Sequence, residues 1–213
     1  MILVRTKLYE LEKRIAGVIS VGFHPLVIPS LTLYILLRQY GLHQTAGTEK
    51  LWLLLGLVLV TTLLLPSVMI WLMMKAGLVG SLSLKRREDR MGPVLITAVF
   101  FYLTYYLARQ FEIAPEFYVY MLGATLLAIV SLLITIYWKI SLHMVAAGGS
   151  TAAFAEYAIL SGKIMPEALI ACVVASGLIG FARLRLSAHK PAEVYGGYLL
   201  GFGIIWAVYL LIK

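Results

Sequence analysis

Long apolar runs limit what this chain can fold into. A helix that spans a membrane needs about 20 mostly apolar residues. We predict seven such helices, the third and sixth short enough to be partly re-entrant, at roughly Ile15–Leu37, Leu51–Met74, Pro93–Ala108, Phe117–Trp138, Leu142–Leu160, Met165–Phe181 and Val194–Ile212. Only 13% of the 213 residues are charged, against about 25% in soluble domains. The sequence therefore predicts an all-α integral membrane protein, a compact bundle of six to seven transmembrane helices.

Prolines mark several of the predicted helix ends. Proline is common in the first turn of a helix, where its missing N–H costs nothing, and four prolines fall at predicted starts: Pro93, Pro115, Pro166 and Pro191. Pro25 and Pro29 lie inside the first span and should kink it. We expect His24 to cap backbone groups that Pro29 frees. Because the connections are short, residues 1–213 form one membrane domain, with an amphipathic N-terminal segment at residues 1–14.

The fifth predicted span differs in composition from the others. It reads HMVAAGGSTAAFAEYA and is rich in Ala, Gly, Ser and Thr. Small residues let helix backbones approach closely within lipid, so we expect this helix at the centre of the bundle. Glu156 lies within it and should face protein rather than lipid.

The positive charges are distributed unevenly over the connections. If all seven helices cross, 13 of the 18 Lys and Arg residues lie on one face, together with the three most polar connections. The positive-inside rule favours the cytoplasm for that face. Basic loops that meet anionic lipid headgroups account for the net charge of +8. We therefore expect membrane lipids rather than nucleic acid as partners, and the inner (plasma) membrane of a bacterium as the location.

The three polar connections carry residues that could act on an anion. They read LKRREDRMGP (84–93), WKISLHM (138–144) and ARLRLSAHKPAEVYGG (182–197). The candidate site residues within them are Lys85, Arg90, Lys139, Ser141, His143, Arg183, His189 and Glu193. His189 and Glu193 are four residues apart, which places them in contact on one helical face. A carboxylate in that position can orient an imidazole and stabilise its cation.

These residue types favour phosphoryl transfer through histidine. The chain has a single Asp, which does not suit a magnesium site, and two histidines without a thiolate are a weak zinc site. We therefore predict no metal and no cofactor. Cations can bind the phosphate oxygens, while one imidazole attacks phosphorus and the other protonates the leaving oxygen.

In order, the three connections resemble the three signatures of the type-2 phosphatidic acid phosphatase superfamily, integral membrane lipid phosphatases. Its first signature is Lys, six residues, then Arg-Pro; here Lys85 and Pro93 match, Gly92 replaces the Arg, and Arg90 is a possible substitute. The second, Pro-Ser-Gly-His, keeps only Ser141 and His143.

The third signature is the most specific of the three. It runs Ser-Arg, five residues, His, three residues, Asp, and here keeps Arg183 and His189 at the right spacing, with Glu193 in place of Asp. The resemblance covers roughly residues 85–200, a phosphatase-like core.

The resemblance implies a role for each matching residue. His189 would be the phosphohistidine nucleophile, Glu193 would orient it, and His143 would be the general acid. The remaining candidates would bind phosphate: Lys85, Arg90, Lys139, Ser141 and Arg183. The implied activity is metal-independent hydrolysis of a lipid phosphate, such as a polyprenyl diphosphate, phosphatidate or a related phospholipid. Family members usually work on the outer membrane face, opposite to the face that the charge count favours.

Two other functions stay open from the sequence. The altered positions at Gly92, Ile140, Leu142 and Ala182 are compatible with a non-catalytic descendant that binds an anionic lipid headgroup. Glu156 within a helical bundle is compatible with a small transporter or channel, although no inverted repeat is visible.

Overall fold

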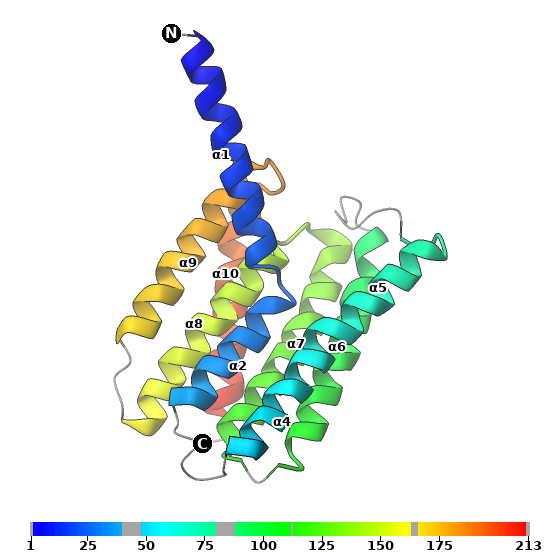
Figure 1. Ribbon diagram of the computed structural model, residues 1–213, viewed down its shortest axis with the longest axis vertical. Coiled ribbons are helices and arrows are strands. Elements are labelled where there is room, and N and C mark those ends of the chain that lie inside the picture. The colour runs from blue at the N-terminus through cyan, green and yellow to red at the C-terminus, as the bar shows by residue number, and fades with distance from the viewer. Residues whose placement is uncertain (1, 40–47, 80–87, 112, 163–165, 212–213) are drawn as a thin grey trace.

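The computed structural model describes residues 2–39, 48–79, 88–111, 113–162 and 166–211. In these ranges all regular secondary structure is helical, and the helices form one bundle (Figure 1). The elements are α1 (Ile2–Gly22), α2 (Val27–Gln39), α4 (Thr48–Leu59), the π-helix η1 (Val60–Leu64), α5 (Leu65–Lys75), α6 (Glu88–Ala108), α7 (Pro115–Tyr137), α8 (Leu142–Ser161), α9 (Pro166–Arg185) and α10 (Pro191–Leu210). The predicted all-α bundle is confirmed.

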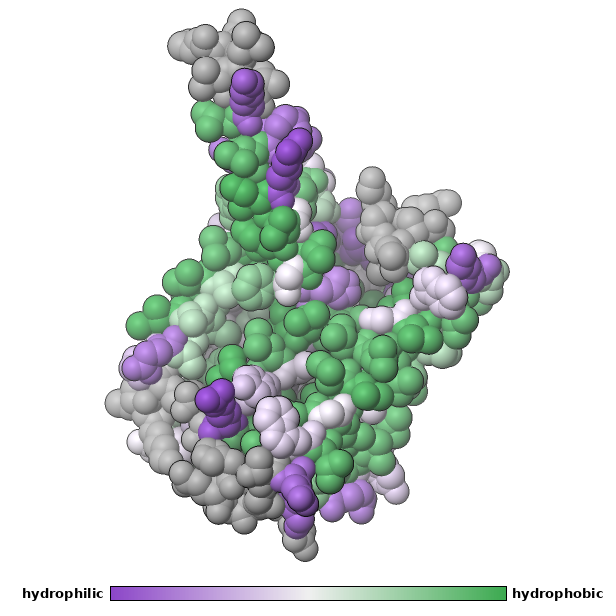
Figure 2. All heavy atoms as spheres, in the orientation of Figure 1, coloured by the Kyte–Doolittle hydropathy of each residue, from purple (hydrophilic) through white to green (hydrophobic). Residues whose placement is uncertain are grey.

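Most of these helices are suited to a membrane. Within the described ranges, five are long and apolar enough to cross a bilayer, and six if α1 and α2 count as one bent span. The upper count agrees with the lower end of the predicted six to seven helices, and α8 is the predicted span that falls outside this criterion. Figure 2 shows apolar side chains covering the middle of the visible face, whereas hydrophilic ones gather on α1 and near the ends of the bundle. The chain is a membrane-embedded helical protein.

The first predicted span is broken rather than continuous. Helix α1 ends at Gly22 and α2 begins at Val27, and the two helices are bent by 61°. The kink expected from Pro25 is confirmed, because a residue that precedes proline avoids the helical conformation. The N-terminal segment predicted at residues 1–14 and the start of the first span form one continuous helix, since α1 runs from Ile2 to Gly22, and its first half extends beyond the bundle (Figure 1).

Three of the four predicted proline starts are confirmed. They are Pro115, Pro166 and Pro191, each the first residue of its helix. The prediction for Pro93 is wrong, since α6 begins at Glu88 and Pro93 lies within it. Helix α6 therefore has 21 residues and carries Arg90 in its first turn.

Helix α9 is longer than predicted. It has 20 residues, continues past Phe181, and carries Arg183 in its last turn. Both α6 and α9 have the length and hydropathy of full spans. The short length that suggested a re-entrant segment at each of these positions is therefore not observed.

Helix α8 lies at the centre of the bundle, as its small residues predicted. It packs against α2, α7, α9 and α10. Its contact with α10 is close because both helices place glycine there: a Cβ on Gly148 would overlap the carbonyl oxygen of Tyr198, and one on Gly201 would overlap that of Val145. The side chain of Glu156 is fully buried within protein, as expected.

The close packing of α8 and α10 also joins their N-terminal ends. The backbone N–H of Ser141, which precedes α8, donates a hydrogen bond to the carbonyl oxygen of Glu193 at 3.1 Å. As a result, the second and third polar connections of the sequence are held side by side.

Candidate functional site

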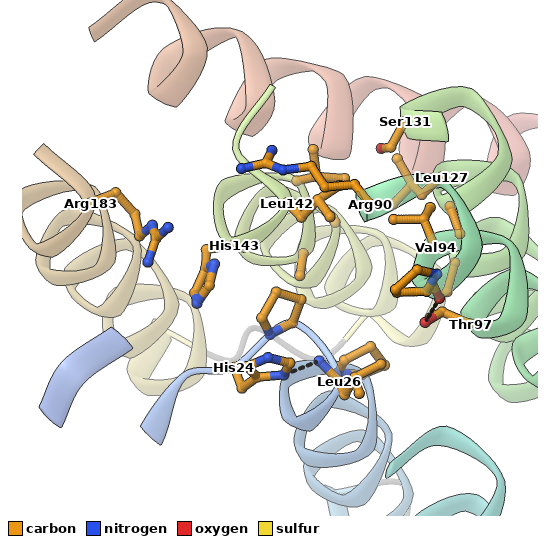
Figure 3. Close-up of a pocket in the computed structure, with 18 of the residues that line it drawn as sticks. His24, Leu26, Arg90, Val94, Thr97, Leu127, Ser131, Leu142, His143 and Arg183 are labelled. Atoms are coloured by element: carbon orange, nitrogen blue, oxygen red, sulfur yellow. Dashed lines mark hydrogen bonds between the residues drawn. The ribbon is translucent and has the colours of Figure 1, made fainter. Parts of the chain in front are cut away.

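A cavity of about 910 Å³ opens where these helix ends meet the break between α1 and α2. Five of the eight predicted site residues line it: Arg90, Lys139, His143, Arg183 and His189. Figure 3 shows His143 and Arg183 on one side of this cavity and Arg90 across from them. The structure thus brings residues from all three polar connections to one place, while their chemical roles stay predictions.

The cavity is polar at one end and apolar further along the bundle. Its inner part is lined by side chains that include Phe101, Leu127 and Ile205. Ile205 is 14 residues along α10 from Pro191, a distance of about 21 Å at the rise of an α-helix. The cavity can therefore hold a polar group and an attached apolar chain at the same time.

His189 and Glu193 form a hydrogen-bonded pair beside this cavity. The Nδ1 atom of His189 lies 2.9 Å from Oε2 of Glu193 and 3.2 Å from the carbonyl oxygen of Lys139. A carboxylate and a carbonyl can only accept, so the proton of neutral His189 belongs on Nδ1 and the lone pair on Nε2.

The backbone geometry that brings His189 and Glu193 together differs from the prediction. His189 precedes α10 rather than sharing a helical face with Glu193, which lies in the first turn. The same Oε2 atom accepts the backbone N–H of Lys190 at 3.2 Å. Glu193 therefore caps α10 and holds His189 with one oxygen.

Burial and neighbouring charges set the protonation of His189. Only 8% of the residue is exposed. Burial lowers the pKa of His189 below its ordinary value of 6.5, the hydrogen bond with Glu193 opposes this, and the positive charges of Arg183 and Arg90 lower the pKa further. The imidazole is therefore neutral at pH 7, the form in which Nε2 can act as a nucleophile.

His143 lies in the first turn of α8 and is oriented by α1. Its Nε2 atom is 3.0 Å from the carbonyl oxygen of Ser20 and 3.4 Å from the hydroxyl of the same residue. Because the carbonyl can only accept, Nε2 carries a proton, and Nδ1 is the nitrogen left for a ligand. Electrostatic interactions link His143 to Arg183, His24 and His189.

The two arginines give the cavity its positive charge. Nη1 of Arg183 donates to the Ser20 hydroxyl at 2.6 Å, and its Nε is buried without a hydrogen-bond partner in the described part of the chain. Arg90 is only 6% exposed, lies 3.5 Å from the carbonyl oxygen of Ile140, and repels Arg183 electrostatically. Cations buried in this way are stabilised by an anion.

The remaining predicted residues lie elsewhere. Lys85 is outside the described residues. Ser141 is fully buried and does not line the cavity; its hydroxyl has no hydrogen-bond partner among the described residues. Its carbonyl accepts the N–H groups of Met144 and Val145 near the start of α8. Gly92 faces α5, because a Cβ there would overlap the end of the Met73 side chain. Among the described residues, Arg90 is therefore the first-signature cation that reaches the cavity.

Sequence analysis missed Ser20 as a residue of this site, and it assigned His24 only a capping role. Both line the cavity at the break between α1 and α2. The available signal was a histidine inside an apolar run, directly before Pro25.

Comparison with protein-family models, curated proteins and solved structures finds no match to this chain. Within the ranges that the structure describes, no three His, Cys, Asp or Glu side chains cluster as metal ligands. Fold and site together define a helical membrane protein with a cationic, histidine-bearing cavity.

Proposed function

We propose that this protein is a membrane lipid-phosphate phosphatase that works through a phosphohistidine at His189, without a metal. The observation that carries the proposal is the position of the His189–Glu193 pair on the same cavity as His143, with Arg90 and Arg183 beside them. A nucleophile, an acid and two phosphate-binding cations thus converge on one place.

The cavity favours a substrate with a charged head and an apolar chain. The free N–H groups of Arg183 and the guanidinium of Arg90 bind the phosphate oxygens through charge-assisted hydrogen bonds. The chain lies along the apolar part of the cavity, between Phe101 and Ile205. A polyprenyl diphosphate, phosphatidate or a related phospholipid fits this description.

In the first step, Nε2 of His189 attacks phosphorus, and the bond from phosphorus to the leaving oxygen breaks. Nδ1 of neutral His143 takes up a proton from solvent when the anionic substrate binds, because the phosphate offsets the positive charge of Arg183. His143 then gives this proton to the leaving oxygen and keeps its Nε2–H on the carbonyl of Ser20. Glu193 stabilises the positive charge that develops on His189.

In the second step, water attacks the phosphohistidine. Neutral His143 takes a proton from this water at Nδ1 while the phosphorus–nitrogen bond breaks. Inorganic phosphate leaves, His143 releases its Nδ1 proton to solvent, and both histidines return to their starting forms.

The test is phosphate release by the purified protein in detergent micelles that contain polyprenyl diphosphate or phosphatidate, with EDTA present. We expect release by the wild type, none by His189→Ala, and wild-type rates for Lys190→Ala, a neighbouring exposed residue. Equal rates for wild type and His189→Ala refute the proposal. Lipid binding without turnover in the wild type would favour the non-catalytic alternative.

We also propose the inner (plasma) membrane of a bacterium as the location. The apolar composition and the net charge of +8, which suits anionic lipid headgroups, support it. Fractionation of the native cells tests this: recovery of the protein in the outer membrane overturns it.

A further inference from the structure

His24 occupies the turn where the first span breaks, and it has two functions to consider. The carbonyl oxygen of His24 accepts the backbone N–H groups of Val27 and Ile28 at 2.8 and 3.2 Å. Its ring nitrogen Nδ1 accepts the N–H of Leu26 at 3.3 Å (Figure 3). His24 therefore caps the start of α2, rather than backbone groups that Pro29 frees. The rest of its ring lines the cavity.

The cap decides which nitrogen of His24 carries the proton. A backbone N–H can only donate, so Nδ1 must present its lone pair to Leu26. The proton of the neutral imidazole is then on Nε2. As long as the cap is formed, His24 is an uncharged side chain with a single N–H donor in a fixed position.

This donor is close to the predicted chemistry. The ring centroids of His24 and His143 are 5.8 Å apart, with an interplanar angle of 73°. In Figure 3 the His24 ring lies below His143 and Arg183, on the same side of the cavity. An anion held by Arg183 and reached by Nδ1 of His143 is therefore within the neighbourhood of the His24 donor.

We propose that the Nε2–H group of His24 is a hydrogen-bond donor to the bound phosphate group, on the side that faces His143. The expected effect on catalysis rests on the proposed function, whereas the expected effect on phosphate binding does not. No proton is transferred: a neutral imidazole donates and stays neutral, as it can at enzyme sites. An uncharged donor adds a contact to phosphate without placing a third positive charge beside Arg90 and Arg183.

Two substitutions separate the donor from the cap. In His24→Asn, the side-chain oxygen can take the place of Nδ1 and accept the N–H of Leu26, but nothing replaces Nε2–H. In His24→Gln, the longer side chain carries its NH₂ group close to the former Nε2 position, but the cap is lost. Each variant therefore keeps one function of His24 and removes the other.

The experiment measures three quantities on wild type and both variants in detergent: binding of inorganic phosphate by calorimetry, phosphate release from phosphatidate, and Tm. We expect His24→Asn to keep the wild-type Tm and to bind phosphate about tenfold more weakly, the loss of one hydrogen bond to a charged group. The kcat/KM should fall by a similar factor. His24→Gln should bind within about threefold of wild type and have a lower Tm.

The outcomes separate the two proposals. Wild-type phosphate affinity in His24→Asn overturns the role of His24 as a donor, whether or not the protein is an enzyme. Weakened binding in His24→Asn, with no phosphate release by the wild type, supports the donor and refutes the phosphatase. A wild type that binds no phosphate overturns the donor role of His24, and one that also releases none from phosphatidate overturns both proposals.

Discussion

The hydrogen bond between His189 and Glu193 is the contact on which the proposed chemistry most depends, and Glu193→Gln tests it. The change keeps the size of the side chain and an oxygen that can accept the N–H of Lys190, so the cap of α10 can persist. It removes the negative charge that lies 2.9 Å from Nδ1 of His189. Because His189 becomes positively charged when it attacks phosphorus, the loss falls on the transition state.

The size of the effect follows from the contact. Glu193 is 8% exposed, so solvent replaces little of what the carboxylate supplies. A hydrogen bond to a charged group contributes about 1.5–3 kcal/mol. At about 1.36 kcal/mol for each factor of ten, kcat should fall about 10- to 150-fold. The hydrogen bond with Glu193 raises the pKa of His189, so the acidic limb of the pH–rate profile should also move to lower pH.

The assay is the initial rate of phosphate release from phosphatidate, measured from about pH 4 to about pH 9 so that the range covers the titration of histidine. Glu193→Asp is the matched control, since it keeps the charge and shortens the side chain by one methylene. We expect it to be at least about tenfold more active than Glu193→Gln. Melting temperatures establish that both variants fold. A wild-type rate and an unmoved acidic limb in Glu193→Gln refute the orienting role of Glu193.

Three further predictions address other parts of the structure. Gly201→Ala places a methyl group against the carbonyl oxygen of Val145 and should cost about 1–3 kcal/mol of unfolding free energy. The control Gly203→Ala places its methyl group in open space and should leave Tm unchanged or higher. Equal melting temperatures for the two variants would contradict the close packing of α8 and α10. Arg90→Gln should lower kcat/KM about 10- to 150-fold through loss of a charge-assisted contact; an unchanged kcat/KM would show that Arg90 does not bind substrate. The pKa of folded His189 lies below 6.5, so the unfolded chain takes up this proton first as the pH falls. The contribution of His189 to unfolding free energy should therefore be complete above pH 6.5 and decrease below it, as chemical denaturation of wild type and His189→Gln can measure; identical pH dependences count against it.

Local patterns in the sequence predicted much of the fold and part of the candidate site. Apolar runs predicted the helices because every backbone polar group in a membrane must be satisfied within its own segment. The spacing of Arg183, His189 and Glu193 predicted a contact that the structure shows at 2.9 Å between the last two. The physical route was misjudged, since the contact forms across the start of α10 rather than along a helical face. Helix periodicity does not describe residues that precede the helix.

Errors in the site arose where the outcome depends on packing. Ser141 was predicted to bind phosphate from its place in a signature, but it is fully buried and does not line the cavity. Ser20 was not predicted, and His24 was predicted only as a cap, because both belong to the first span and are 119 or more positions from His143. Hydrogen bonds between α1, α8 and α9 bring these segments together.

The sequence by itself determined the membrane bundle, the prolines that begin three helices, and the small residues that place α8 at its centre. These properties depend on hydropathy and on the conformations open to single residues, which act locally. Only the tertiary structure decided that the His24 ring lines the cavity, that Arg90 rather than Gly92 faces it, and that Ser20 orients His143. Those outcomes depend on how each helix is rotated and tilted against its neighbours, and that is set jointly by side chains far apart in the chain.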